Sequence, residues 1–362
     1  MWLADDVNNH CECDECVKMR PSDWYVMMLN ELDEELTREE IDTRILFIMY
    51  VDTVRPPEKL RLKNPKRFIL LAAIGQQYQK GYVAEAYTGE IPPYEKNNFK
   101  TVPNALRLKW HRDWKQMHGN IPSMIFEYRF YTDMYCDLSQ MQVCRETYRD
   151  MNAIAKVGFN GCMSDQTHRM YMPTALSLVM MGATLFDKNT DYDIVAEEYF
   201  EGAFGKDGAL CRKYLEELSC LLCPSNVRVG GGKGIEERGL VSDEANKCGW
   251  INNPYVAKQA AKIPALIDKF MPVIIKNIST SNDEAQRISW NYLTYHAEIC
   301  KIYSTILLSG AQNDMDAARE KYKELKEYHE IHEMEYHNVF DLFLFDRFIS
   351  LKLGIPLPGY FE

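Results

Sequence analysis

The sequence predicts an α/β fold followed by an all-α region: a partial (β/α)8 TIM barrel of about five parallel strands, then a helical domain. In the first half of the chain, short apolar runs alternate with amphipathic helical segments, a pattern typical of parallel βα units. From about Asp191 onward the alternation stops, and every long segment has helical periodicity. We therefore expect residues 1–188 to form the C-terminal half of a barrel and residues 189–362 to form the helical domain.

The predicted strands are nearly continuous apolar runs, as expected for strands that are buried on both faces. Three of them span residues 43–51, 68–74 and 123–130. A clipped apolar run at residues 1–4 precedes them, and a short strand at residues 161–164 follows. Together these runs give the count of about five strands.

The helices are predicted from apolar residues that recur every three or four positions. We expect Ser22 to cap the first helix, and Pro173 to occupy the first turn of the helix that follows the last strand. The remaining helical segments of the front half and of the rear are residues 104–117, 140–155, 192–201, 210–222, 254–278, 284–308 and 315–351.

A complete eight-stranded barrel needs about 250 residues, so the predicted strands account for roughly half of one. Sheet edges left open expose backbone pairing groups that natural proteins cover. We therefore expect the chain either to complete its sheet in another way or to be truncated, and we expect its relatives to contain the N-terminal half of the barrel.

Composition narrows the classes of partner. The chain has 53 acidic and 42 basic residues and a net charge of −11, so it has no basic field that would attract nucleic acid. No run approaches the roughly 20 apolar residues of a membrane span, and the first residues lack the pattern of a signal peptide. The 11 cysteines are an odd number in a chain too large to need disulfides. We expect a cytoplasmic protein with mostly free thiols.

Three segments carry a resemblance to a known family. They are the stretch from Asp5–Asp6 through CxCxxC (residues 11–16) to Pro21–Ser22–Asp23, the segment YVDTVRPP at residues 50–57, and residues 158–182. In these segments the chain resembles the family catalogued as domain of unknown function 4838, and CxCxxC followed by PSDxY is the most specific part. The resemblance implies a bacterial barrel protein related to β-hexosaminidases and other glycosidases. The family has no established reaction, so chemistry must be argued from the residues.

Asp5 and Asp6 are the candidate catalytic residues. They follow the first apolar run, and barrel enzymes build their active sites at the carboxyl ends of the strands. Glycosidases need one protonated and one ionised carboxyl group, and two close carboxyls shift each other's pKa apart. The resemblance implies substrate assistance, in which one carboxyl orients a 2-acetamido group and the other donates a proton. The alternative is an acidic loop that caps the next segment or binds a surface cation.

Cys11, Cys13 and Cys16, with His10 beside them, have a spacing compatible with three or four zinc ligands in one loop. Such a structural zinc ion would rigidify the loop beside the acidic pair. No second cysteine pair follows at the distance found in zinc ribbons, so a local disulfide or free thiols remain the alternatives.

Other polar and aromatic residues near the predicted strand ends are candidate sugar contacts. Aromatic rings stack on pyranose faces, while Asp, Glu, Gln and Arg bind hydroxyl groups, although each residue could instead be structural. The sequence thus predicts a retaining N-acetylhexosaminidase-type enzyme that requires no cofactor or, alternatively, a non-catalytic carbohydrate-binding or scaffold protein of the same fold. The candidate contacts are Tyr50, Asp52, Tyr78, Glu127, Tyr128, Arg129 and Gln166.

Overall fold

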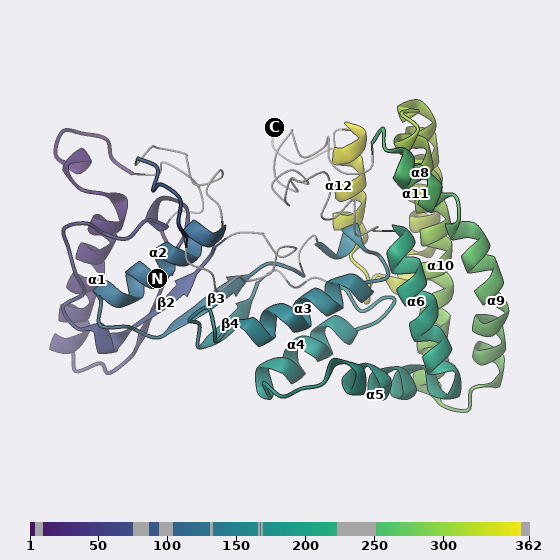
Figure 1. Cartoon of the computed structure of the whole chain (residues 1–362), viewed down its shortest axis with the longest axis horizontal. Coiled ribbons are helices and arrows are strands. Elements are labelled where there is room, and N and C mark those ends of the chain that lie inside the picture. Colours follow the sequence, from purple (N-terminus) through teal and green to yellow (C-terminus); the bar gives the residue numbers. More distant parts are fainter. Residues whose placement is uncertain are drawn as a thin grey trace. The chain divides into compact units, whose positions relative to one another are not determined.

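A computed structural model of the chain describes residues 1–3, 10–74, 87–93, 104–130, 133–165, 167, 169–222 and 251–355 (Figure 1). The chain divides into two compact units. The first contains residues 1–76, 82–128 and 153–165, and the second contains residues 77–81, 129–152 and 166–362. The division after residue 188 into a barrel half and a helical domain stays a prediction.

The first unit contains a parallel sheet whose strands are ordered as they occur in the sequence, β1-β2-β3-β4. This sequential order is that of a (β/α) barrel, whereas a doubly wound sheet reverses direction at a switch point. The prediction of a parallel sheet followed by a helical region is confirmed. The strands are β1 (Ile45–Met49), β2 (Phe68–Ala72), β3 (Ser123–Glu127) and β4 (Gly161–Ser164).

Both faces of the sheet are covered by apolar side chains, which explains why the strands are continuous apolar runs. On one face, Phe47 of β1 contacts the rings of Tyr25 and Trp114, at centroid distances of 5.9 and 5.7 Å. Tyr25 lies on α1 (Pro21–Arg38) and Trp114 on α2 (Asn104–Met117), so these two helices cover that face. On the other face a cluster forms around Ile48, Leu71, Ala73 and Phe126.

The fifth strand, predicted near the start of the chain, is not found among the described residues. Met1, Trp2 and Leu3 are not assigned to a strand, but they lie beside β1 because the Met1 amino group donates a hydrogen bond to the carbonyl of Leu46. The buried hydroxyl of Tyr25 ties the two segments together, since it donates to the Met1 carbonyl at 2.6 Å and accepts from the Ile48 N–H at 3.1 Å. Burial raises the pKa of Tyr25 to about 12.

Two predicted helix starts are wrong. The helix α1 begins at Pro21 with Arg20 as its N-cap, and Ser22 is buried inside the first turn rather than capping it. Proline fits this first position because its missing N–H would have no partner within the helix. Pro173 does not begin α4 (Leu176–Phe186), which starts three residues later.

The second unit is built from helices, and its central helix is α10 (Figure 1). Trp290 of α10 is fully buried and donates from its ring N–H to the carbonyl of Phe204 at 3.1 Å. No helix within the described ranges is both long and apolar enough to cross a membrane. The helices of this unit are α3 (Met141–Ala153), α4, α5 (Tyr192–Phe204), α6 (Gly208–Leu222), α8 (Pro254–Ala260), α9 (Ile263–Thr280), α10 (Glu284–Ala311), α11 (Met315–Tyr336) and α12 (Leu342–Leu353).

Two long predicted helices are each divided in the structure. The segment 254–278 forms α8 and most of α9, and the segment 315–351 forms α11 and most of α12. The second break has a clear cause, because Phe340 forms a bridge with Met170 and the Asp341 carboxylate caps α12 by accepting from the Leu344 N–H at 3.1 Å.

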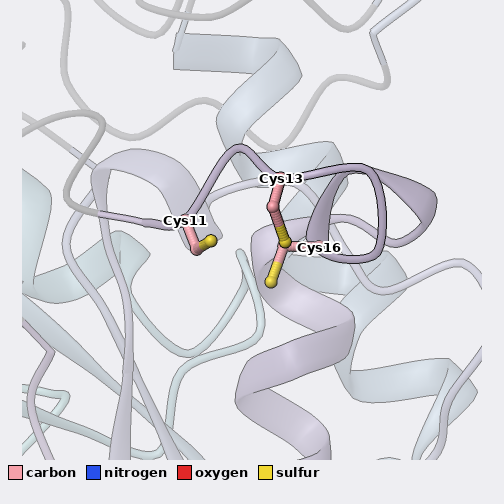
Figure 2. Close-up of side chains that lie close together, drawn as sticks. All are labelled: Cys11, Cys13 and Cys16. Carbon is pink, nitrogen blue, oxygen red and sulfur yellow. The ribbon is translucent and has the colours of Figure 1, made fainter.

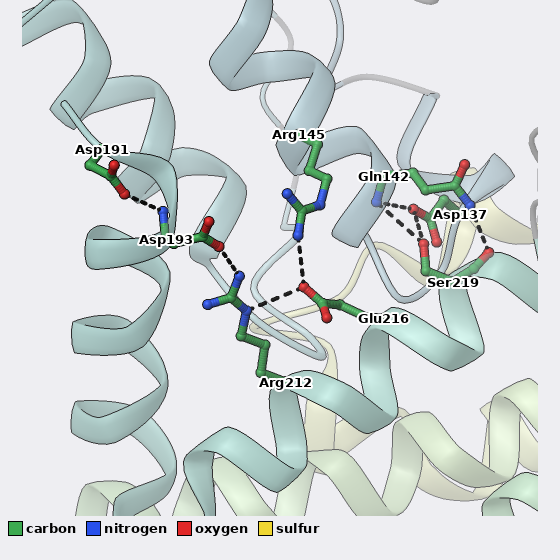
Figure 3. Close-up of polar contacts among 8 residues, drawn as sticks. All are labelled: Asp137, Gln142, Arg145, Asp191, Asp193, Arg212, Glu216 and Ser219. Atoms are coloured by element: carbon green, nitrogen blue, oxygen red, sulfur yellow. Dashed lines mark hydrogen bonds and ion pairs between the residues drawn. The ribbon is translucent and has the colours of Figure 1, made fainter. Parts of the chain in front are cut away.

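A polar network joins α3 and α6 in the second unit (Figure 3). The buried Asp137 carboxylate, just before α3, accepts from the Ser219 hydroxyl of α6 at 2.7 Å. Closer to solvent, Glu216 of α6 accepts from Arg145 of α3 at 3.0 Å and from Arg212 at 3.2 Å. Exposed ion pairs contribute little stability, so the buried Asp137 contact is the stronger constraint on how these helices align.

His111 on α2 links that helix to the sheet. Its Nε2 lies 2.8 Å from the Ser123 hydroxyl of β3, and its ring stacks on Phe159 at 4.0 Å. Burial, with smaller effects from Lys115 and Arg112, lowers the pKa of His111 to about 3. The imidazole is therefore neutral in the folded protein over the whole range in which an exposed histidine titrates.

We predict that acid destabilises the protein partly through His111. The unfolded chain binds a proton near pH 6.5 but the folded chain does not, so this contribution is complete above pH 6.5 and is lost as pH falls toward 3. The loss is roughly 1.4 kcal/mol per pH unit. Urea unfolding at a series of pH values should show a flatter pH dependence for His111→Gln than for the wild type.

The matched control is Gln116→Ala, which changes an exposed residue of the same helix that has no titratable group, and it should leave the slope unchanged. Equal slopes for the wild type and His111→Gln would contradict the prediction.

Candidate functional site

A pocket of about 280 Å³ opens at the carboxyl end of β1, entirely within the first unit. The carboxyl ends of parallel strands are where barrel proteins bind their ligands. The residues that line the pocket come from the start of the chain, the cysteine loop, α1 and the turn after β1. They are Trp2, Leu3, His10, Cys11, Cys16, Pro21, Trp24, Met28, Ile48, Tyr50, Val51, Asp52 and Thr53.

The turn after β1 supplies four consecutive residues of the pocket wall, from Tyr50 to Thr53. Its shape is fixed by the Thr53 hydroxyl, which accepts from the Tyr50 N–H at 3.0 Å and lies 3.2 Å from the Ile48 carbonyl. Val51 has a φ of 47°, in the left-handed region that β-branched residues rarely adopt. Such strain persists where surrounding contacts over-determine the backbone and is concentrated at functional sites.

His10 and Asp52 meet in this pocket, although they are 42 residues apart in sequence. The His10 Nδ1 lies 3.1 Å from the Asp52 carboxylate oxygen, and both side chains are partly exposed. The pair can donate a hydrogen bond from the imidazole and accept one at the carboxylate, which suits a ligand that carries hydroxyl groups.

Two tryptophans add apolar surface to the wall. Trp2 is 51% exposed and its ring lies edge-on to Phe126 at a centroid distance of 6.3 Å. Trp24, from the first turn of α1, donates from its ring N–H to the Cys16 carbonyl at 2.9 Å. One indole is therefore accessible to a ligand, while the other also fixes the cysteine loop.

The thiols of Cys11, Cys13 and Cys16 converge at the edge of the pocket, with their sulfur atoms all within 4.8 Å of one another (Figure 2). The backbone N–H of Cys16 and the thiol of Cys11 stabilise the Cys13 thiolate and lower the pKa of Cys13 to about 7. The pKa of Cys16 rises to about 11, because its thiol donates to the other two sulfurs. His10 is not part of this group, because its ring nitrogens do not lie within 4.8 Å of all three sulfurs.

Asp23 of the PSDxY motif has a structural role that the sequence analysis did not assign. It is fully buried, and its carboxylate accepts hydrogen bonds from the backbone N–H groups of Glu58, Lys59 and Leu60, at 3.1, 2.7 and 2.8 Å. These three residues directly follow the YVDTVRPP segment. Two of the motifs that carried the family resemblance are therefore joined through one carboxylate.

The remaining predicted site residues lie elsewhere. Glu127 is fully buried at the end of β3, and Tyr128 packs edge-on against Phe126 at 4.8 Å, in the apolar cluster that also includes Tyr50. Arg129 belongs to the second unit, where it forms a buried ion pair with Asp150 at 3.1 Å. Four other predicted site residues fall outside the described residues: Asp5, Asp6, Tyr78 and Gln166.

Sequence reasoning missed Trp2, Trp24 and Val51 as parts of the site. The two tryptophans could have been predicted from the sequence. Trp2 lies close to Asp5 and Asp6, and Trp24 lies within the PSDxY motif. The positive φ of Val51 had none, since valine is among the residues least expected in that conformation.

The first unit contains a parallel βα sheet with a pocket at the carboxyl end of β1. Residues 4–216 match the family described as Domain of unknown function (DUF4838), and the chain belongs to that family. Neither the curated proteins nor the solved structures give a match to the chain.

We predict that Asp23→Asn destabilises the first unit. The substitution replaces one carboxylate oxygen with an NH2 group that cannot accept from the backbone N–H groups of residues 58–60. The expected loss of unfolding free energy is roughly 2–3 kcal/mol, as for other buried hydrogen bonds to a charged group. Chemical denaturation followed by circular dichroism measures it.

Asp42→Asn, at an exposed position before β1, is the control and should change stability by less than about 0.5 kcal/mol. If the two variants unfold at the same denaturant concentration, Asp23 does not hold the loop in the way described.

Proposed function

We propose that the chain is a glycoside-hydrolase-like protein that binds a glycan in the pocket at the carboxyl end of β1. The observation that carries the proposal is the composition of this pocket: the exposed Trp2 ring for stacking on a sugar face, and the His10–Asp52 pair for hydroxyl groups. A volume of about 280 Å³ suits a small ligand such as one sugar residue. The sequential order of the parallel strands supports a relation to the barrel glycosidases.

We further propose that Asp5 and Asp6 supply the catalytic carboxyl groups of a retaining, substrate-assisted hydrolysis. The proposal is supported by Leu3 and His10, the described residues that precede and follow this segment, because both line the pocket. In this reaction one carboxylate orients the 2-acetamido group of the sugar, while the other carboxyl protonates the leaving oxygen. The chemistry needs no cofactor.

A second candidate function is glycan binding without hydrolysis. Among the described residues that line the pocket, Asp52 is the single carboxylate, and it is paired with His10. A site with this composition can hold a sugar without cleaving it. Activity measurements must therefore be made beside binding measurements.

We also propose that the protein is cytoplasmic. The proposal rests on its odd number of cysteines, 11, which suits a reducing compartment. The structure shows free thiols at Cys11, Cys13, Cys16, Cys144, Cys162, Cys211, Cys220 and Cys300.

We predict that Trp2→Ala weakens binding of N-acetylglucosamine and short oligosaccharides by roughly tenfold. The reason is the loss of a stacking surface worth about 1.4 kcal/mol. Isothermal titration calorimetry measures the effect directly. The control is Phe186→Ala on α4, which removes an aromatic ring that is 95% exposed and outside the pocket, and it should bind as the wild type does. Equal affinities for the two variants would count against the pocket as the glycan site.

We predict that the protein hydrolyses an aryl 2-acetamido-2-deoxy glycoside and that both aspartates are needed for full activity. Asp6→Asn should lower kcat by about 10²–10⁴-fold on substrates with poor leaving groups, and much less on activated aryl glycosides, because only the former need strong proton donation. Asp5→Asn should impair both kinds of substrate, since it removes the carboxylate that orients the acetamido group.

The matched control for these variants is Asp42→Asn, which should retain full activity. Sugar binding without turnover by the wild type would favour the second candidate function. Unchanged hydrolysis in both site variants would contradict the assignment of the acids.

A further inference from the structure

Besides the His10–Asp52 pair, the first unit contains a second group of reactive side chains. It consists of Cys11, Cys13 and Cys16, which lie on one loop. Figure 2 shows the three side chains close together on this loop, with the sulfurs of Cys13 and Cys16 next to each other. Cys11 and Cys13 are exposed and Cys16 is partly buried, so the group is open to solvent. The glycan chemistry proposed above makes no use of these thiols.

The backbone holds the loop in the conformation that brings the sulfurs together. The Val17 N–H donates to the Cys13 carbonyl at 3.1 Å and the Lys18 N–H to the Glu15 carbonyl at 3.2 Å, which forms a short helical turn after Cys13. The Trp24 ring N–H donates to the Cys16 carbonyl at 2.9 Å and fastens the end of this turn to α1. These contacts hold Cys13 and Cys16 on one turn, and the three thiols are free rather than joined in a disulfide.

The distances suit a thiophilic metal ion. Zn–S bonds of about 2.3 Å in a tetrahedron separate two sulfurs by roughly 3.5–4 Å. The three sulfurs here lie within 4.8 Å of one another. Side-chain rotations that move the sulfurs by about 1 Å therefore bring them to the separation found around zinc. Calcium and magnesium prefer oxygen ligands, and the group consists of sulfur atoms alone.

Among the residues that the structure describes, no fourth donor joins the three sulfurs. His10 is not among the described residues whose ligand atoms all lie within 4.8 Å of one another, and its Nδ1 lies 3.1 Å from the Asp52 carboxylate. Zinc sites that keep three protein ligands leave the fourth position to water or a substrate, whereas closed four-ligand sites are structural. Cys11 and Cys16 also line the pocket, so an ion bound by them lies at its wall.

We infer that Cys11, Cys13 and Cys16 bind one zinc ion at the wall of the pocket through three thiolates, with the fourth position open to a small exogenous ligand. The site uses none of the residues assigned to hydrolysis or to glycan contact and does not depend on glycan binding. Its ligand class is a water molecule, a small anion or a thiol that reaches the pocket.

The experiment is metal analysis of the protein purified under reducing conditions, followed by replacement of zinc with Co²⁺. The wild type should bind one metal ion per chain and should show thiolate-to-cobalt charge-transfer bands with the strong visible absorption of tetrahedral cobalt. Added azide or cyanide should shift the visible bands, because an open position accepts the anion.

The variants Cys11→Ser, Cys13→Ser and Cys16→Ser should each reduce the bound metal substantially below one ion per chain. Cys220→Ser on α6 is the matched control, since it removes another exposed free thiol that lies outside the group, and it should retain the full stoichiometry. Circular dichroism of each variant shows whether it is folded. A folded variant that loses the metal supports the assignment.

Three outcomes would overturn the inference. The first is that the reduced wild type binds no zinc or cobalt. The second is that a disulfide forms among the three cysteines and persists under the same reducing conditions. The third is a cobalt spectrum that added anions do not change, which would mean a closed four-ligand site. Because no sugar is present in these measurements, failure of the glycan proposal leaves them unaffected.

Discussion

The buried carboxylate of Asp23 is the contact on which the pocket depends. It lies in the first turn of α1 and accepts three backbone N–H groups from residues 58–60, which fixes the end of the loop that follows β1. A carboxylate taken out of water is stable only when its oxygens are fully hydrogen-bonded, so this arrangement has little freedom to change. The first turn of α1 therefore holds residues 58–60 through Asp23, and it holds the cysteine loop through the hydrogen bond from Trp24 to the Cys16 carbonyl.

Apolar patterning was sufficient to predict the sheet. The short strand at residues 161–164 and the helix at 104–117 have the same bounds in the structure as in the prediction, because each is delimited by clear turn residues. The breaks within the rear helices were not predictable in this way. The segment 315–351 keeps its helical periodicity across the break, and the cause of the break is a tertiary contact between Phe340 and Met170.

The sequence predicted individual residues of the candidate site, but it did not predict which of them contact one another. His10 and Asp52 were each identified as candidates, the first for a metal and the second for a sugar, yet the structure pairs them with each other at 3.1 Å. That pairing depends on how two loops pack, and residue spacing carries no information about it. Arg129 was predicted to contact a sugar because it follows a strand end. In the structure it instead forms a buried ion pair with Asp150.

Val51 shows how the site differs from an ordinary strand end. In a continued strand, side chains alternate between the two faces, so consecutive residues could not line one pocket. The left-handed conformation of Val51 ends the alternation, and all four residues from Tyr50 to Thr53 then contribute to the wall. Left-handed backbone at a β-branched residue costs on the order of 1–3 kcal/mol, which the hydrogen bonds of the Thr53 hydroxyl and the burial of Val51 must offset. A glycine would adopt this turn without that cost, so the valine side chain contributes something that glycine cannot. Val51 lines the pocket, and its side chain supplies apolar surface there that a glycine would lack.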